Sequence, residues 1–408
     1  MHGVFIDGAE LFDNKHFGIS NIEAGGMDPT QYLLMEAGYE ALYLTGFRKK
    51  NLMNALVGVY VGQGAVEVAP TDSGLSMGGT GAARAVSCGR ISFALGMQGP
   101  CCAIDAHGAT AFACLEVGFQ SLRNQSKTFK TAIAGSVMLT FSPHGYVACC
   151  AAGYLSPIGR CCSFDASALG YSKSEGCAFA CLQASEGQPA QDVAEHRLGA
   201  FSAVEIASVG RAARLGAPNA PAEQAVVAQA LRGAELSPLN VEVVECVADG
   251  ELLSDAVEAG YLGRSMRWED PGATPLVLGA VMSQAGFMRE AAGFAQLLKM
   301  LGSLTSGAMM SNLHLASLNP HMDEVPLESL QLVTESVGCR LPSTFGGITS
   351  RGAGGTVTHA ILAVEVAADA DGGDRLASRR GRSLAEGLAF WPAGGGDETP
   401  AGDGEPSM

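Results

Sequence analysis

Apolar runs bounded by glycine alternate with helical periodicity along most of the chain. Short runs at residues 56–62, 131–137 and 177–182 predict buried strands. A fourth strand, at 101–104, leads directly into a helix over about 109–123. Strands that alternate with helices in this way indicate a mostly parallel sheet system covered by helices.

The same alternation restarts in the second half of the chain. The elements predicted there are, in order, a helix at 225–232, strands at 241–244 and 275–281, a helix at 290–301 and a strand at 359–364. The irregular stretch between Ala180 and Phe201 is interpreted as the link between the halves. A repeated pattern over 408 residues predicts either two domains or one large duplicated fold.

From about Ala367 onward the chemistry changes. Acidic residues are interspersed there with glycine, proline, alanine and arginine, which predicts a largely disordered acidic tail at 366–408. Residues 383–391 have enough apolar side chains to form one short helix within this tail. Docking of that helix onto another surface is an alternative interpretation.

Composition narrows the class of protein. The chain is 47% hydrophobic and 16% charged, which is typical of a well-buried α/β protein. A formal net charge of -16 argues against a nucleic-acid partner. No run of about eighteen apolar residues appears, and residues 1–7 lack a basic segment, so we expect neither a membrane span nor a signal peptide.

Six of the twelve cysteines form adjacent pairs, at Cys101-Cys102, Cys149-Cys150 and Cys161-Cys162. None shows the C-x-x-C spacing of a zinc knuckle or redox motif. We therefore expect reduced core cysteines in an intracellular, cytoplasmic protein. No metal, nucleotide or flavin motif is present, so no cofactor is expected.

A strand–turn–helix segment at 99–112 carries the strongest chemical signal. The turn reads Asp105-Ala106-His107-Gly108-Ala109 and opens a helix, where unpaired N–H groups and the helix dipole favour negative charge. A cysteine at such a position has a lowered pKa and acts as a nucleophile. Here the tip carries neither a thiol nor a hydroxyl.

The segment resembles the G-P-x-x-x-[VI]-D-T-A-C-S-S-S-L block of the β-ketoacyl synthases of type I polyketide and fatty-acid synthases, with Gly99, Pro100, Asp105 and Ala109 in register. Other blocks similar to those of the family follow in order. They lie at residues 17–20 (F-G-I-S), 27–36 (M-D-P-T-Q-Y-L-L-M-E), 159–165 (G-R-C-C-S-F-D), 170–176 (G-Y-S-K-S-E-G), 312–314 (N-L-H), 319–321 (N-P-H) and 343–359. The resemblance covers roughly residues 3–365.

The resemblance implies a thiolase-like fold, in which two similar α/β halves form a five-layer α-β-α-β-α sandwich. We expect an N-terminal half at 1–185 and a C-terminal half at 190–365. The family begins with a strand similar to P-I-A-I-V-G, which has no counterpart here, so we expect a gap with unpaired backbone groups in the first sheet. The family also implies an acyl thioester or acyl carrier protein as partner, and either a homodimer or a heterodimer with an active ketosynthase.

The same register shows which residues occupy the catalytic positions of the family. Gly108 stands at the cysteine. In residues 245–259, similar to the E-A-H-G-T-G-T block, Val247 stands at the first histidine. In residues 279–293, similar to the G-S-x-K-S-N-x-G-H block, Met282 stands at the lysine and Phe287 at the second histidine.

Condensation needs a thiolate to carry the acyl chain and imidazole N–H groups to stabilise the developing charge. Glycine, valine and phenylalanine supply none of these groups. The sequence therefore predicts a catalytically inactive ketosynthase-like protein that acts as a scaffold, a silent dimer partner, or a binder of acyl groups or carrier proteins.

Some alternatives stay open at this point. Backbone amides at Gly108 and near Phe345 and Gly346 are candidates for an oxyanion pocket, with 348–354 as an inserted loop beside it. A diverged acyltransferase or thioesterase, or a residual β-ketoacyl synthase, would need a new nucleophile; the candidates are Cys102, Cys114 and His107. A non-functional fragment of a synthase is a third interpretation.

Overall fold

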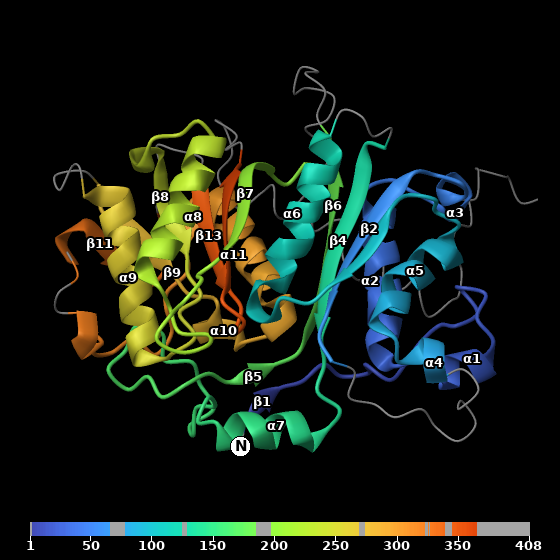
Figure 1. Cartoon of the computed structure of the whole chain (residues 1–408), viewed down its shortest axis with the longest axis horizontal. Helices are drawn as coiled ribbons and strands as arrows, with labels where there is room; N and C mark the ends of the chain where they lie inside the picture. The colour runs from blue at the N-terminus through green and yellow to red at the C-terminus, as the bar shows by residue number, and fades with distance from the viewer. Residues whose placement is uncertain are drawn as a thin grey trace, which may run out of the picture.

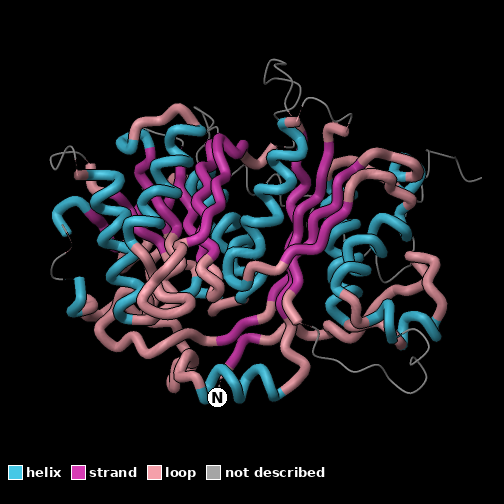
Figure 2. The backbone as a smooth tube through the Cα atoms, in the orientation of Figure 1, coloured by secondary structure: helices cyan, strands magenta, loops and turns pink. Residues whose placement is uncertain are grey.

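The computed structural model describes residues 2–65, 78–124, 129–184, 197–268, 274–322, 325, 327–338 and 345–364. Two sheets separated by helices form its frame (Figures 1 and 2). The predicted acidic tail at 366–408, with its candidate helix, lies outside the described residues.

The first half of the chain contains the first sheet. Its elements are, in order, β1 (Gly3–Val4), α1 (Asn21–Gly25), α2 (Pro29–Leu44), α3 (Lys49–Leu52), β2 (Val57–Gln63), α4 (Gly78–Gly81), α5 (Arg84–Leu95), β3 (Cys101–Ile104), η2 (His107–Ala109), α6 (Thr110–Arg123), β4 (Thr131–Met138), α7 (Pro143–Ala151), β5 (Lys173–Ser174) and β6 (Gly176–Gln183).

The second half of the chain contains the second sheet. Its elements are, in order, β7 (Ala200–Ser208), α8 (Ala220–Gly233), η3 (Pro238–Asn240), β8 (Val241–Glu245), α9 (Leu252–Arg267), β9 (Leu276–Gly279), α10 (Met282–Ala285), η4 (Arg289–Ala291), α11 (Ala292–Ser306), β10 (Ala308–Met309), η5 (Pro320–Met322), η6 (Leu327–Ser329), β11 (Leu330–Leu332), β12 (Val337–Gly338), β13 (Phe345–Arg351) and β14 (Thr356–Ala363).

Helix boundaries follow local chemistry. Asp28 caps α2 by accepting a hydrogen bond from the Thr30 N–H at 2.8 Å, and Pro29 stands in the first turn, where its missing N–H is not needed. At the other end, α5 stops at Gly96 and α11 at Gly307, both in the left-handed conformation that glycine adopts without steric penalty.

The two sheets repeat one arrangement. The first has the order β3-β2-β4-β6, in which β2, β3 and β4 are parallel and β6 is antiparallel to β4. The second has the order β11-β9-β8-β13-β14-β7, in which β9, β8 and β13 are parallel and β14 is antiparallel to β13. The run β9-β8-β13-β14 therefore repeats the run β3-β2-β4-β6, which is the signature of a duplicated fold.

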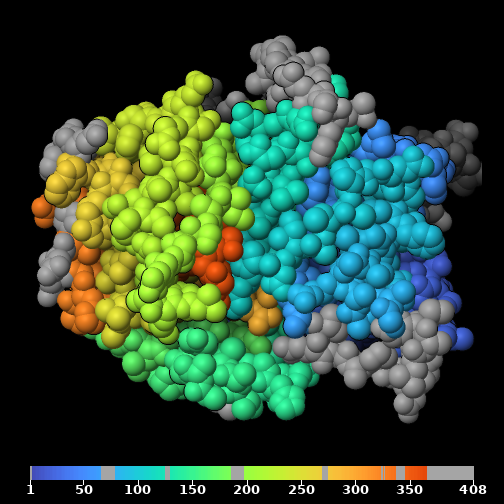
Figure 3. Space-filling view, viewed as in Figure 1, coloured from blue at the N-terminus to red at the C-terminus, as the bar shows by residue number. Residues whose placement is uncertain are grey.

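The layers stack as α-β-α-β-α. Helices α2 and α5 cover the outer face of the first sheet, α6 and α11 lie between the sheets, and α8 and α9 cover the outer face of the second (Figure 1). The duplicated five-layer thiolase-like fold that the resemblance implied is confirmed. On the face drawn in Figure 3, segments of the two halves lie against each other.

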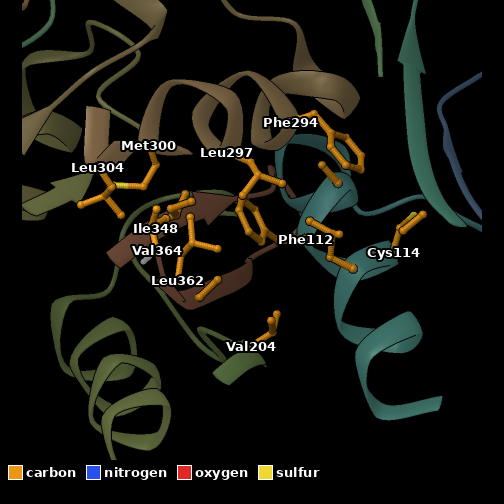
Figure 4. Close-up of a cluster of buried hydrophobic side chains, with 14 of the residues drawn as sticks. Phe112, Cys114, Val204, Phe294, Leu297, Met300, Leu304, Ile348, Leu362 and Val364 are labelled. Carbon is orange, nitrogen blue, oxygen red and sulfur yellow. The ribbon is translucent and has the colours of Figure 1, made fainter. Parts of the chain in front are cut away.

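The central layer holds a core to which both halves of the chain contribute. Phe112 of α6 meets Phe294 and Leu297 of α11, and the cluster continues to Ile348 of β13 and Leu362 of β14 (Figure 4). Each of these side chains is at most 4% exposed. Full burial of such side chains stabilises the fold by roughly 1.5–3 kcal/mol each, so this layer fixes how the two halves sit together.

Most predicted elements are confirmed, with two corrections. The loop expected at 348–354 is instead the end of strand β13, which runs to Arg351 before a tight turn into β14. The cysteines of the described residues are free thiols, but Cys101 and Cys102 are exposed instead of buried, because β3 is an edge strand. Within the described ranges, no helix is long and apolar enough to cross a membrane.

A histidine is buried in the second sheet. His359 lies in β14, between Thr349 of β13 and Glu205 of β7, and is 1% exposed. Neither ring nitrogen has a hydrogen-bond partner among the described residues. Burial lowers the pKa of His359 to about 4, so the ring is neutral at pH 7.

We predict that this residue makes the protein sensitive to acid. Because the pKa is lower in the folded state, stability is fully present above the unfolded pKa of 6.5 and falls as the pH drops towards 4. At 1.36 kcal/mol per pKa unit, the loss is about 3 kcal/mol. Denaturant unfolding of the wild type and of His359→Leu at several pH values between 7.5 and 4.5 measures it.

The His359→Leu variant should lose the part of the acid dependence that the histidine causes. His321→Leu, at an exposed position, serves as the control and should keep the wild-type pH dependence. An identical pH dependence in the wild type and in His359→Leu would contradict the prediction.

Candidate functional site

The turn between β3 and α6 keeps the geometry of a nucleophile turn. The Ala106 N–H donates to Thr110 Oγ1 at 2.8 Å, and the His107 N–H donates to Asp105 Oδ1 at 3.3 Å. His107 has φ +55°, in the left-handed region where a non-glycine residue is strained. Gly108 follows, buried, within the short helix η2.

No side chain fits at Gly108. A Cβ atom built there would overlap the carbonyl oxygen of Arg351 and would lie 3.1 Å from Cζ of Phe287. The first contact is with backbone, which cannot give way as the end of a flexible side chain can. The position that the resemblance assigns to the cysteine is therefore closed as well as empty of a thiol.

Arg351 is the residue that closes it, and its side chain is anchored in a buried acidic cluster. The guanidinium lies 3.4 Å from both carboxylate oxygens of Glu223 and also donates to Ser254 Oγ. Burial alone would lower the pKa of Arg351, but Glu223 and Glu258 raise it above its ordinary value. The arginine therefore stays charged, and its ion pair with Glu223 holds the end of β13 against Gly108.

Val247 lies on the other side of the same cluster. Its N–H donates to Glu258 Oε1 at 2.9 Å, and the next N–H, of Ala248, donates to Glu258 Oε2 at 3.0 Å. Thr349 Oγ1 donates to the same carboxylate at 2.6 Å. The valine side chain is 5% exposed and lines a cavity of about 10 Å³, together with Arg351 and His359. That volume suffices for about one water molecule.

Phe287 and Met282 fill the remaining space. The Phe287 ring packs against the Tyr171 ring edge-on, with centroids 4.9 Å apart, and its N–H donates to the Ser172 carbonyl at 2.8 Å. Met282 is 1% exposed and belongs to the same apolar cluster, with Cys161. Gly108 thus lies between Phe287, which shares an apolar cluster with Met282, and Arg351, which lines the small cavity beside Val247.

Phe345 and Gly346, the expected oxyanion-pocket residues, do not join this region. They stand at the start of β13, opposite Ala363 and Leu362, whereas Arg351 at its end meets Gly108. The space above Gly346 is filled by Met300. Strand residues advance about 3.3 Å each, so the two ends of β13 lie roughly 20 Å apart.

The sequence contains a signal that identifies Arg351. Counted back from Gly355 and Thr356, the spacing of the family block S-F-G-x-x-G-T falls on Ser350, Arg351 and Gly352. Phe345 and Gly346 match its letters but not its spacing. By that spacing, the resemblance assigns Arg351 to the phenylalanine position of the block.

The alternative nucleophiles lie in unfavourable places. Cys114 is fully buried in the central core, and burial raises the pKa of its thiol well above the usual range. Cys102 lies exposed on edge strand β3, opposite Tyr60, before the turn begins. Burial, followed by the charge of Arg289, lowers the pKa of His107 to about 4. Asp105 accepts from the His107 backbone and pairs with Arg84 at 2.5 Å.

Metal chemistry has no evident site in this region. Within the part of the chain that the structure describes, no group of three or more His, Cys, Asp or Glu residues is arranged to hold a metal ion. The carboxylates around Arg351 are engaged by backbone N–H groups, hydroxyls and the guanidinium.

We predict that restoring a side chain at position 108 destabilises the fold. Gly108→Ala and Gly108→Cys should each lose about 1–3 kcal/mol of unfolding free energy, because the new Cβ forces the Arg351 backbone away. Gly354→Ala is the matched control in the adjoining hairpin, since no atom lies within 4 Å of its ideal Cβ. Chemical denaturation measures all three; wild-type stability in the Gly108 variants would contradict the close contact.

Family models match both halves of the chain. The model described as the N-terminal domain of β-ketoacyl synthase matches residues 1–187, and the model described as its C-terminal domain matches residues 198–316.

Polyketide synthases are among the relatives. The chain is 31% identical over 369 residues to one polypeptide of the phenolphthiocerol/phthiocerol polyketide synthase of Mycobacterium bovis, covering 88% of this chain and 19% of that polypeptide. It is 30% identical over 422 residues to a different polypeptide of the phenolphthiocerol/phthiocerol polyketide synthase of Mycobacterium tuberculosis, covering 98% of this chain and 27% of that polypeptide. The chain thus spans about a fifth to a quarter of the length of these relatives.

Solved ketosynthases share the fold. The oxazolomycin ketosynthase domain of Streptomyces albus superimposes with a TM-score of 0.81 at 26% identity, covering 98% of this chain and 71% of that one. A ketosynthase from module 6 of the bacillaene synthase of Bacillus subtilis gives a TM-score of 0.80 at 25% identity, covering 89% and 62%. The fold, the family models and the ordered sequence blocks agree, and the chain belongs to the β-ketoacyl synthase family.

Proposed function

We propose that this chain is a non-condensing member of the family that acts by binding other proteins, as the silent partner of a ketosynthase. The observation that carries the proposal is the closed position at Gly108. Without a Cβ there is no atom from which a nucleophile can reach an acyl thioester, and the Arg351 carbonyl occupies the space that the side chain would need.

The side chains that would transfer protons and stabilise charge during condensation are missing at the same place. Val247 and Phe287 offer no N–H in their side chains to stabilise an enolate, and Met282 carries no charge. Replacing polar catalytic groups by apolar ones lets the region pack as an ordinary core, with Phe287, Met282 and Cys161 in one cluster. A cavity of about 10 Å³ beside Val247 leaves no room there for an acyl chain.

An exposed strand edge supports a role in protein binding. Among the described residues, strand β3 pairs only with β2, and Cys101 and Cys102 at its start are exposed. Unpaired backbone groups on an edge strand are a template for pairing with another chain. Because the acyl site is closed, we place the function at such surfaces, and an acyl carrier protein is the second candidate partner.

The rival proposal is a diverged acyltransferase or thioesterase. It would rely on His107, since Cys114 is buried and Cys102 lies before the turn. The imidazole is neutral at pH 7 and beside the old nucleophile position, which favours this idea. However, Nδ1 of His107 is buried without a hydrogen-bond partner among the described residues, so no carboxylate orients the ring as a base requires.

We predict that the purified chain forms no acyl-enzyme. After incubation with an acyl thioester, intact-mass spectrometry should show the unmodified mass, because no nucleophile is available at position 108. The exposed thiols Cys101 and Cys102 can exchange with thioesters without catalysis, so urea-denatured chain serves as the control. Any slow labelling should be no faster in the folded protein.

Faster labelling of the folded chain would contradict the proposal. Peptide mapping then decides between the candidates: an adduct on His107 would establish the acyltransferase, and substitution His107→Gln should abolish it.

A further inference from the structure

Two cysteines from different elements meet on the outer face of the first sheet. Cys88 lies in α5, one of the helices that cover this face, and is 3% exposed within the apolar cluster between the helix and the sheet. Cys101 is the first residue of β3, which packs against α5. The Cys101 side chain is a hydrogen-bond partner of the Cys88 thiol, so the two sulfurs are neighbours.

The alternation of side chains along β3 explains why Cys101 faces the helix and Cys102 does not. Successive side chains of a strand point to opposite faces of the sheet. Ala103 shares a face with Cys101 and packs on the same cluster as Cys88. Ile104 shares a face with Cys102 and packs on the central cluster with α6. Cys102 is therefore an exposed cysteine on the same strand that points away from Cys88.

The two thiols of the pair differ in their access to solvent. Cys101 is exposed on edge strand β3, whereas Cys88 is enclosed by the cluster. Burial, followed by the neighbouring Cys101, raises the pKa of the Cys88 thiol to about 11. Since the thiolate is the reactive form of cysteine, Cys88 is a poor target for reagents from solution. An oxidant from solution therefore meets Cys101 first, with Cys88 directly beside it.

The contact between the sulfurs makes a covalent link accessible. A disulfide needs an S–S distance of about 2.05 Å, which two thiols in contact approach by rotation about their side-chain bonds. Holding Cys88 beside Cys101 also raises its effective concentration there, which offsets its low thiolate fraction. The Cys88 thiol donates to the Ala85 carbonyl at 3.4 Å within its own helix, a weak hydrogen bond that oxidation would break at little cost.

We propose that Cys88 and Cys101 form a redox modification site, at which a peroxide converts the two thiols reversibly into a disulfide between α5 and β3. The link ties the edge strand to the helix behind it and removes the exposed thiol of Cys101 from that edge. The proposal does not depend on the proposed loss of catalysis, because it rests on the packing of α5 against β3.

The modification proceeds in two steps. Hydrogen peroxide oxidises the Cys101 thiol to a sulfenic acid and is itself reduced to water. The Cys88 sulfur then attacks the Cys101 sulfur: the S–S bond forms, the S–O bond breaks, and the hydroxyl leaves as a second water with the proton of the Cys88 thiol. One peroxide thus consumes two thiols and yields one disulfide and two waters. A dithiol such as dithiothreitol reverses the modification.

The test counts free thiols in the full chain. Reduced protein is treated with a slight excess of hydrogen peroxide, denatured and alkylated with N-ethylmaleimide, and its intact mass is then measured. The oxidised chain should carry two labels fewer than the twelve of the reduced chain, and dithiothreitol should restore them. Digestion without reduction should yield one peptide pair that joins Cys88 to Cys101.

Three substitutions assign the two sulfurs. Cys101→Ser should prevent the loss of labels. Cys88→Ala should leave the sulfenic acid at Cys101 without a resolving thiol, so that its labelling by dimedone rises about tenfold over the wild type. Cys102→Ser is the matched control on the opposite face of the same strand, and it should form the disulfide at the wild-type rate. If Cys88→Ala fails to fold, the exposed pair Cys101→Ser and Cys102→Ser still decides.

Several outcomes would overturn the proposal. They are a disulfide that joins other cysteines, a cross-link between two copies of the chain, oxidation of Cys101 to the sulfinic acid with no disulfide, and equal behaviour of Cys101→Ser and the wild type. Urea-denatured chain under the same peroxide provides the baseline, since it lacks the contact between α5 and β3. A Cys88–Cys101 link that forms as fast in urea as in the folded chain would also contradict a site built by the fold.

Discussion

The contact between the Arg351 carbonyl oxygen and Gly108 is the constraint on which the closed site depends. It exists because strand β13 continues to Arg351 and because the guanidinium of that residue is held by Glu223 and Ser254 in the second half of the molecule. Breaking one partner of a buried ion pair leaves an uncompensated charge, which is strongly unfavourable. The acidic cluster therefore fixes the backbone at Arg351, and the backbone at Arg351 admits only glycine at position 108.

Residues at two of the other assigned positions lie on either side of that contact. The Phe287 ring reaches towards Gly108 from one side, and Glu258 holds the main chain at Val247 on the other. In the family these positions carry the groups that hold an acyl chain and stabilise its enolate. This chain has the scaffold of two sheets and a central helical layer, and the side chains of Val247, Met282 and Phe287 are buried in it. The preserved fold and the altered site are compatible, because sheet pairing and the Phe112–Phe294 core lie outside the substituted positions.

Much of this could be predicted from the sequence, since buried strands leave continuous apolar runs and the family blocks occur in order. The runs at 56–62 and 131–137 became β2 and β4. The assignment of Gly108, Val247, Met282 and Phe287 to the family's catalytic positions rests on their flanking residues and stays a prediction. Arg351 was missed because Phe345-Gly346 matched the letters of a block whose spacing points to Ser350-Arg351-Gly352. The exposure of Cys101 and Cys102 could not be read from an apolar run, since it depends on β3 being at a sheet edge.

The central claim is that no condensation takes place in this molecule. The most direct measurement combines the purified chain with an acyl thioester and a malonyl thioester and quantifies both carbon dioxide and the β-ketoacyl product by mass spectrometry. An active ketosynthase assayed in parallel calibrates the detection. We predict that carbon dioxide and the β-ketoacyl product form no faster with the chain than in a reaction without protein. The reason is that neither a nucleophile nor an enolate-stabilising N–H side chain stands at the positions that the resemblance assigns. Product formed in repeated turnovers would contradict it and would show that the region around Gly108 opens in solution.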